Sequence, residues 1–339
     1  MTIGSEEFSR QIEPYRRELL AHCYRMLGSV DDAEDAVQET HLRAWRSHGT
    51  FAGRSSLRAW LYRIATNACL TALEKSRRRA LPSGLASPGA ESSAPTTLAD
   101  LDVAWLQPIP DALVTTPSAD PAAIAATRES VRLALVAGLQ FLPPRQRAVL
   151  ILREVLNFPA TEVAAMLDTS TAAVKSTLQR ARARLDDVAP EPEHLTEPTD
   201  PHAQALLRDY IDGFENHDTV ALERALRTDA AIELVGTRTW FSGRGTCLSF
   251  LAQVIGSPGR WTMIPTIANG QPAAAAYQRD QDGIHHAYGL GILTVTATGI
   301  ARVTVFGDGP DLVARFGLPP VHTATDAAPT TSRRSAAPR

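Results

Sequence analysis

The chain has 339 residues, of which 44% are hydrophobic and 21% charged. That length suits two or three domains, and that composition excludes a wholly disordered chain. Three cysteines, Cys23, Cys69 and Cys247, are too few and too scattered for a disulfide framework or a structural zinc site. No apolar stretch approaches 18 residues and no export signal opens the sequence, which favours a cytoplasmic protein. We expect no cofactor and no metal.

The formal net charge of −3 is unevenly distributed. Residues 1–80 carry 13 Lys and Arg against 10 Asp and Glu, and residues 128–187 carry nine against six. Residues 81–127 hold five acids and no base, whereas residues 188–339 carry 12 bases against 16 acids. Two mildly basic segments, separated by an acidic linker and followed by an acidic module, can bind a polyanion such as nucleic acid.

Helical periodicity runs from residue 13 to residue 79. The pattern predicts a helix cap at Asp31, with Glu34 completing a capping box, and another cap at Ser55-Ser56. The helix after the second cap has a strong apolar stripe made of Leu57, Trp60, Leu61, Ile64 and Ala68. It ends in the basic run 75–79. The sequence therefore predicts a small helical bundle.

Residues 81–127 are rich in Pro, Ala and Ser and predict a linker. A short apolar motif containing Trp105, Leu106 and Pro108 interrupts the linker. We expect this motif to pack against another part of the protein, because a tryptophan left in solvent would lose the free energy of burying its large apolar surface. Residues 188–201 predict a second linker, and residues 321–339 a disordered tail.

Residues 128–187 predict short helices that end in a helix-turn-helix. Val163, Ala164 and Leu167 face inward, residues 168–170 turn the chain, and Val174 returns to the same core. The outward positions of the last helix are suited to contact DNA: Thr171, Ala172, Lys175, Ser176, Gln179, Arg180 and Arg182. On this pattern alone, an αα-hairpin with a solvated basic face is the alternative.

Together these segments resemble the sigma-70 family of initiation factors. Residues 15–20, 32–40 and 57–70 are similar to region 2 of the extracytoplasmic-function (ECF) group, and residues 142–147 with the helix-turn-helix are similar to region 4. The resemblance implies an RNA polymerase sigma factor and not an enzyme, with region 2 over 10–80 and region 4 over 128–187. The family turn usually carries glycine where this chain has Asp168; aspartate tolerates the left-handed conformation, so we expect the turn to survive.

The resemblance also implies partners and surfaces. The partners are core RNA polymerase, through its β′ clamp helices and β flap, and promoter DNA, whose −35 element would meet the last helix of region 4. The implied polymerase-binding residues are Asp32, Glu34, Asp35, Gln38 and Glu39. The implied −10 contacts are Arg58, Arg63, Thr66 and Asn67, with Arg77, Arg78 and Arg79 as a phosphate clamp. Trp60 is expected to be core.

Residues 202–320 begin with helices and continue as strands, a pattern typical of an α+β domain. Residues 210–214, 267–274 and 316–319 resemble the SnoaL-like (NTF2-like) cone, and together with the Trp105 motif they point to the SigG-like branch of the ECF group; the Asp-Gly-Gly-Gly-Lys signature of a related branch is absent. The fold class expected is therefore multidomain: two all-α sigma modules and a C-terminal α+β NTF2-like cone. We expect the cone to tune activity, with the Trp105 linker packed between it and the sigma modules.

The cone leaves alternatives open. Candidate acid–base residues in a cone pocket are Tyr210, Asp212, Glu233, Tyr277, His285 and His286, but no pair has a spacing that demands catalysis. The cone could instead bind a small molecule, and an anti-sigma factor is a further possible partner. Two other functions fit parts of the sequence: a helix-turn-helix regulator with a ligand-binding domain, and a bifunctional enzyme.

Overall fold

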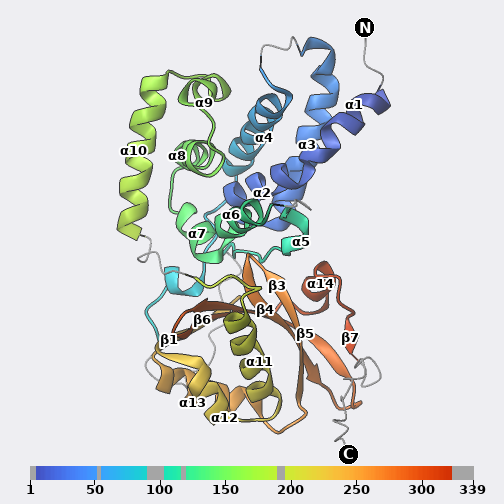
Figure 1. The fold of residues 1–339 in the computed structure, drawn as a ribbon, viewed down its shortest axis with the longest axis vertical. Coiled ribbons are helices and arrows are strands. Elements are labelled where there is room, and N and C mark those ends of the chain that lie inside the picture. The colour runs from blue at the N-terminus through green and yellow to red at the C-terminus, as the bar shows by residue number, and fades with distance from the viewer. Residues whose placement is uncertain (1–4, 52–54, 90–102, 116–119, 189–194, 323–339) are drawn as a thin grey trace, which may run out of the picture.

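The computed structural model describes residues 5–51, 55–89, 103–115, 120–188 and 195–322 (Figure 1). Helices form one part of the molecule, and a curved sheet with its own helices forms the other. Parts of the predicted linkers, residues 90–102, 116–119 and 189–194, lie outside the described residues, as does the predicted tail from residue 323.

The first helical module packs α2, α3 and α4 against one another. Gly28, at φ 68°, ends α2, and the next residue, Ser29, caps α3 by accepting a hydrogen bond from the Asp32 N–H. The predicted cap at Asp31 is therefore wrong, because the cap lies two residues earlier. The Ser56 cap is confirmed, since its hydroxyl accepts from the Ala59 N–H. The helices of this module are α1 Ser5–Ile12, α2 Arg16–Leu27, α3 Val30–Ser47 and α4 Leu57–Leu73.

The second helical module begins inside the predicted first linker. Asp120 caps a helix whose first residue is Pro121, a favourable start because proline has no N–H to leave unpaired. The α-helix Pro144–Leu150 continues directly into a π-helical turn over Ile151–Val155. The helices of this module are α5 Asp111–Val114, α6 Pro121–Val131, α7 Leu133–Leu139, α8 Pro144–Leu150, α9 Ala160–Met166 and α10 Thr171–Val188.

The cone has helices α11 Pro201–Glu215, α12 Thr219–Ala225, α13 Arg244–Ile255 and α14 Gly309–Arg315. Its strands are β1 Leu226–Val235, β2 Trp240–Ser242, β3 Trp261–Ala268, β4 Gln271–Arg279, β5 His285–Thr296, β6 Gly299–Phe306 and β7 Val321–His322. The main strand order is β2-β1-β6-β5-β4-β3, and β7 pairs with β5. β1 runs parallel to β6, whereas the other pairs are antiparallel. The first two residues of the predicted tail are therefore a strand.

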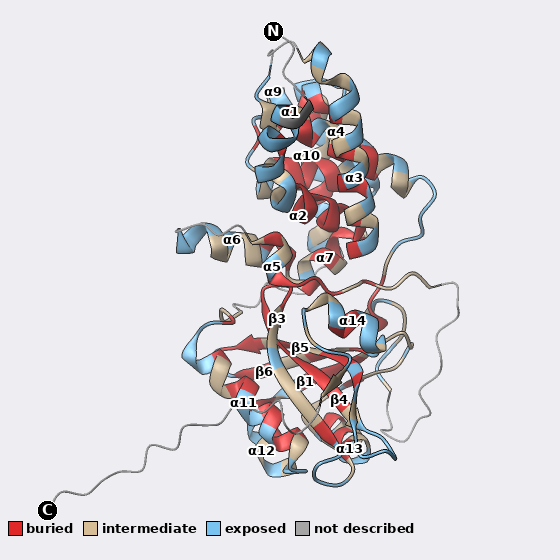
Figure 2. Ribbon diagram, turned by 90° about the vertical axis from the view of Figure 1, so that its right-hand side faces the viewer, coloured by how far each residue is buried: buried red, intermediate tan, exposed pale blue. Residues whose placement is uncertain are grey.

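The two faces of the sheet belong to different cores. One face packs against α11, α12 and α13, with Phe214, Ile232 and Trp261 buried between them. The other face contributes Tyr277 and Leu290 to a core that continues without a break through the linker and both helical modules. Figure 2 shows buried segments on both sides of the junction between helices and sheet. The three modules therefore share the second of these two cores, and the first belongs to the cone alone.

His22 lies completely buried between α2 and α4. Its Nε2 is 3.0 Å from the Thr66 hydroxyl, and its ring contacts Tyr62 edge-on. Burial, and secondarily the nearby Arg25 and Arg58, lower the pKa of His22 to about 3. The folded chain therefore excludes a proton that the unfolded chain accepts below about pH 6.5.

We predict that this histidine makes the chain less stable as the pH falls from about 6.5 towards 3. A pKa lowered in the folded state costs stability once the unfolded state binds the proton, on the order of 2 kcal/mol at pH 5. Chemical denaturation at pH 7 and pH 5 measures this difference, which should shrink in His22→Gln. His217→Asn, which changes an exposed histidine at positive φ, should leave it unchanged. An unaltered pH slope in His22→Gln would contradict the assignment.

Candidate nucleic-acid and polymerase interfaces

The outward face of α10 is open. Thr171, Ala172, Lys175, Ser176 and Gln179 are exposed, while Val174 and Ala181 point into the core. Arg180 and Arg182 are also exposed, and Arg182 forms an ion pair with Glu154. The structure thus places all seven predicted −35 residues on one helix surface, as a recognition helix requires.

The turn before α10 depends on Asp168. This residue has φ 50°, so the expected left-handed conformation is present without glycine. Thr169 N–H then bonds to Ala164 O at 2.9 Å, and Ser170 caps α10 through the Ala173 N–H. The turn fixes the angle at which α9 and α10 meet.

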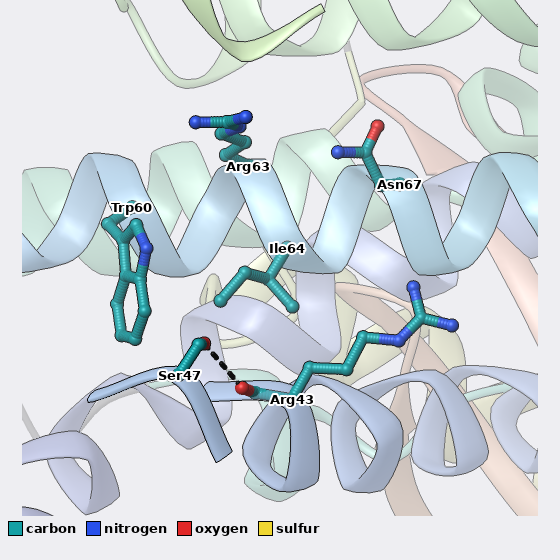
Figure 3. Close-up of a pocket in the computed structure, with 6 residues that line it drawn as sticks. All are labelled: Arg43, Ser47, Trp60, Arg63, Ile64 and Asn67. Atoms are coloured by element: carbon teal, nitrogen blue, oxygen red, sulfur yellow. Dashed lines mark hydrogen bonds between the residues drawn. The ribbon is translucent and has the colours of Figure 1, made fainter. Parts of the chain in front are cut away.

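A cleft of about 280 Å³ lies between α3 and α4 (Figure 3). Trp60 and Ile64 point from α4 toward α3 and form its apolar wall, with Arg43 on α3. Arg63 and Asn67 also line the cleft, and Figure 3 shows their side chains on the side of α4 away from α3. Trp60, expected to be core, is only half-buried; its ring meets Phe8 edge-on and lies tilted against Phe51. The cleft combines an aromatic surface with cations and an amide, the chemistry that holds unpaired bases.

Two predicted −10 residues are turned away from that cleft. Thr66 is completely buried against His22, so the expected base contact is wrong for this structure. Arg58 pairs with Glu18 (Nε–Oε2 3.1 Å) and its guanidinium sits 4.9 and 4.8 Å from the ring centres of Tyr62 and Phe158. Because Phe158 precedes α9, Arg58 joins the two helical modules instead of facing outward.

The three arginines of the basic run after α4 have different environments. Arg77 and Arg78 are exposed, and Arg78 stacks on Phe141 at 4.2 Å. Arg79 instead pairs with Asp32 at 2.5 Å and donates to the Trp105 carbonyl at 3.0 Å. The expectation of a free phosphate clamp is therefore wrong for Arg79, which neutralises one of the predicted polymerase-binding acids.

The remaining predicted polymerase residues follow one face of α3. Asp35 and Gln38 are exposed, and Glu34 and Glu39 are half-buried, with Glu39 paired to Arg43. Sequence reasoning missed that Leu42 and Trp45 continue this face, 48% and 47% exposed. The available signal was helical spacing, because Leu42 lies four residues after Gln38 and Trp45 lies three residues after Leu42. An acidic stripe that ends in exposed apolar side chains is suited to a protein partner.

The cone covers the start of that helix. Arg315 of α14 pairs with Asp31 at 2.6 Å, and Gln107 donates to the same carboxylate at 2.8 Å. The Gln107 side-chain oxygen also accepts from the Ser29 hydroxyl and the Val30 N–H. The linker and the cone therefore occupy the N-terminus of α3 together.

The docked part of the linker is 106–111 rather than Trp105. Leu106, Pro108 and Ile109 are buried, whereas Trp105 is half-buried and contributes its backbone, in a bridge to Ala80. Gly28 makes room for this segment, because a Cβ there would lie 2.6 Å from Leu106 Cδ2. The linker thus lies directly on the end of α2.

The turn between β3 and β4 enters the helical modules (Figure 1). We call residues 268–271 the latch hairpin. Asn269 is completely buried, and its Nδ2 donates to the Tyr24 hydroxyl and to the Val131 carbonyl, both at 2.7 Å. Its Oδ1 accepts from the Ile109 N–H at 3.0 Å, and its own N–H bonds to Ile109 O. One side chain therefore ties α2, the linker and α6 to the cone.

Neighbouring polar groups strengthen this attachment. The Gly270 N–H donates to Asp111 at 2.7 Å, and Asp111 also pairs with Arg128 at 2.9 Å. Glu197, in the described part of the second linker, pairs with Arg128 and Arg132. Both linkers are thus held at the same junction.

The candidate acid–base residues of the cone do not meet. Tyr210 lies in the core under α11, whereas Glu233, which follows the buried Ile232 on β1, faces the opposite side of the sheet. Glu233 accepts hydrogen bonds from the Ser83 N–H and hydroxyl and pairs with Arg302. Tyr277 donates to the Pro319 carbonyl, His286 pairs with Asp282 on the exposed end of β5, and His285 contacts the Gly259 carbonyl. Asp212 is exposed on α11.

Comparisons with known proteins agree with this arrangement. The Sigma-70 region 2 family matches residues 11–79, and the Sigma-70, region 4 family matches residues 132–185. The chain is 50% identical over 316 residues to the ECF RNA polymerase sigma factor SigG of Mycobacterium tuberculosis, covering 92% of this chain and 84% of SigG. It is 34% identical over 173 residues to SigJ of the same organism, about half of each chain.

A solved structure has the same fold. The crystal structure of M. tuberculosis SigJ aligns with a TM-score of 0.58 at 24% identity, covering 91% of this chain and 99% of that one. The likeness includes the C-terminal α+β module, so the expected fold class of two helical sigma modules and an NTF2-like cone is confirmed. Within the part of the chain that the structure describes, no helix is both long and apolar enough to cross a bilayer.

The turn before α10 yields a stability test. Asp168→Ala should destabilise the chain by about 1 kcal/mol, because alanine lacks the local hydrogen bonding that makes positive φ tolerable for aspartate. Asp168→Gly should be as stable as the parent or more so. Thermal denaturation measures both, with Asp186→Ala on the exposed side of α10 as the control. If alanine proved more stable than glycine, the turn would not have the conformation described.

Proposed function

The chain belongs to the ECF RNA polymerase sigma factors of the sigma-70 family, and on that premise we propose that its cone holds the two sigma modules in a closed arrangement that must open for promoter binding. By closed arrangement we mean the one described here, in which region 2, region 4 and the cone share a core. The observation that carries the proposal is the latch hairpin, buried between the cone and both modules.

The spacing of promoter elements supports this reading. Elements centred at −10 and −35 lie about 25 base pairs apart, which is about 85 Å of B-DNA at about 3.4 Å per base pair. In this structure α4 contacts α8 and α9, and Arg58 stacks against Phe158. An α10 of 18 residues is only about 27 Å long, so modules packed this closely do not span the two elements. Promoter binding would require the modules to separate.

Each surface then has a proposed role. The exposed face of α10 would read the −35 element, with Thr171 and Gln179 reaching base edges and Lys175 and Arg180 meeting phosphates. The α3–α4 cleft would hold an unpaired base of the −10 element against Trp60, with Arg63 and Asn67 at its rim. The stripe on α3 from Asp35 to Trp45 would bind the β′ clamp helices.

The closed arrangement also protects the polymerase-binding helix. Asp31 is neutralised by Arg315 of the cone, and the neighbouring Asp32 by Arg79 within region 2 itself. A basic surface on the polymerase would have to displace these arginines. The polymerase surface and Arg315 would compete for Asp31, because Arg315 cannot pair with Asp31 while a basic group of the polymerase is bound there. Polymerase binding would therefore favour release of α14 from α3.

We further propose that the cone does no bond chemistry. Its most deeply buried carboxylate, Glu233, is already held by Ser83 and Arg302, and its other candidate residues lie apart. Selective initiation requires binding energy rather than a catalytic group from this chain. The protein would act in the cytoplasm, where RNA polymerase works. An anti-sigma factor or a small ligand of the cone would be a further input that acts on the same closed arrangement.

The latch gives the decisive test. Asn269→Gly keeps a residue suited to φ 55° but removes three side-chain hydrogen bonds, together worth about 2–3 kcal/mol. If the open form is the binding-competent one, the apparent affinity for core polymerase should rise on the order of tenfold or more. Promoter-dependent transcription in vitro should rise with it at subsaturating protein.

The matched control is Gln281→Gly, in the exposed turn between β4 and β5 at the other end of the same sheet. It should leave both quantities at the parental value. Equal polymerase affinity for the parent and Asn269→Gly, in variants of normal secondary structure, would show that the latch does not restrain the modules.

DNA recognition by α10 has a separate test. Lys175→Gln removes one phosphate contact, so the slope of log affinity against log salt for promoter DNA should become shallower by about 1. Gln179→Ala should change the preferred −35 sequence and leave the slope nearly unchanged. Holoenzyme binding to promoter fragments measures both, with Arg208→Gln on α11 as the control. A salt slope that is insensitive to Lys175 would remove α10 from the interface.

A further inference from the structure

A second cavity lies where region 2, the linker helix α6 and region 4 meet. This interregion cleft has a volume of about 210 Å³ and is lined by Glu18, Arg25, Arg58, Tyr62, Ser130 and Leu156, among others. Its walls come from α2, α4, α6 and the π-helical turn, and both α4 and α6 pack against α2 (Figure 1). The cleft therefore exists only in the closed arrangement.

Arg25 is the unusual residue of this cleft. Its side chain is 3% exposed, and its Nη1 donates to the Ser130 hydroxyl at 2.7 Å. Among the described residues no carboxylate pairs with it, and its buried Nε has no acceptor. Burial lowers the pKa of Arg25 to about 10, so the guanidinium still carries its charge at neutral pH. Buried charges in proteins are normally paired, because an unpaired one costs several kcal/mol.

A purely structural role explains Arg147 better than Arg25. Arg147 is equally buried and its Nε also lacks an acceptor, but its two terminal nitrogens donate to the carbonyls of Met26, Gln140 and Leu142 and to the Gln140 side chain. Four acceptors surround that cation, including a carbonyl at the end of α2, where a helix favours positive charge. Arg25 has a single hydroxyl, and it lies on the wall of a cavity.

A second cation faces the same space. Arg58 is held between the rings of Tyr62 and Phe158, and its Nε pairs with Glu18. Glu18 is the only carboxylate among the residues that line the cleft, so two guanidinium groups face one acid. The lining has a net charge of +1 and donors fixed on two different helices.

We propose that the interregion cleft binds the phosphate group of a small metabolite, held by Arg25 and Arg58. Arginine recognises oxyanions through several hydrogen bonds at once, and a tetrahedral group presents oxygens to donors on separate walls, as a planar carboxylate does not. The volume equals about seven water molecules at about 30 Å³ each, which suits inorganic phosphate or a short phosphate ester. Typical pockets for larger ligands begin at about 300 Å³.

Such a ligand would stabilise the closed arrangement, a consequence that rests on the proposed function. Because the cleft needs region 2, α6 and region 4 together, an anion bound there favours the closed form over the open one. Polymerase binding and phosphate binding would then oppose each other by the same factor.

Binding is tested first, on the full chain, with sodium phosphate as the probe at constant ionic strength in a sodium chloride background. Isothermal titration or phosphorus NMR should show saturable binding. Arg25→Gln should weaken it at least tenfold, and Arg58→Gln several-fold. Glu18→Gln should strengthen it several-fold, because the competing carboxylate is lost; a misfolded variant cannot produce that gain. Arg208→Gln should bind like the parent.

Three different results would contradict three different parts of the proposal. No saturable binding by the parent, or binding unchanged in both Arg25→Gln and Glu18→Gln, would overturn the site. Tighter binding of malonate than of phosphate would overturn the choice of a phosphate group. If phosphate binds as expected but does not lower the affinity of the chain for core polymerase, the site stands and its link to the closed arrangement fails.

Discussion

The structure depends on one buried polar contact, in which Asn269 reaches from the cone into the helical modules and satisfies groups of α2, α6 and the linker. Buried polar groups must be paired, so this contact holds well only when all three partners are in place. Water can satisfy the same groups once the surfaces part, which makes the net strength of each hydrogen bond modest. A polar latch of this kind closes with high geometric specificity and still permits opening.

Many arginines of this chain bind acids, carbonyl oxygens or aromatic rings of the chain itself. Regional charge suggested two basic surfaces for nucleic acid, yet Arg79 and Arg128, from those two segments, pair with acids inside the chain. Arg147 binds carbonyl oxygens, and Arg58 lies between two aromatic rings. The exposed cations include groups on α10 and after the end of α4, and others lie on α1, α2 and the cone. Net charge over a segment therefore measures the balance of its cations and anions and says little about how many of the cations face solvent.

Local signals predicted much of this fold. The apolar stripe of α4, the two faces of the helix-turn-helix and the strand runs of the cone all depend on nearest neighbours, and the structure has them close to the expected residues. The exposed −35 face of α10 followed from the same periodicity. Thr66, Arg58 and Arg79 were misjudged because their partners His22, Phe158 and Asp32 lie 44, 100 and 47 positions away in sequence. The contacts of Asn269 join residues up to 245 positions apart, so the residues next to Asn269 in sequence do not predict them.

The latch hairpin has a consequence for how such chains diverge. Asn269 and Gly270 both have positive φ and form the turn between β3 and β4. The same two residues make the hydrogen bonds to Tyr24 and Asp111 that attach the cone to the helical modules. A Cβ on Gly270 would lie 2.6 Å from the Arg128 carbonyl, which leaves no room for another residue. Selection that maintains a well-formed sheet thereby preserves communication between the cone and the transcription modules. A substitution at this turn would therefore disturb both the pairing of β3 with β4 and the contact between the cone and the helical modules.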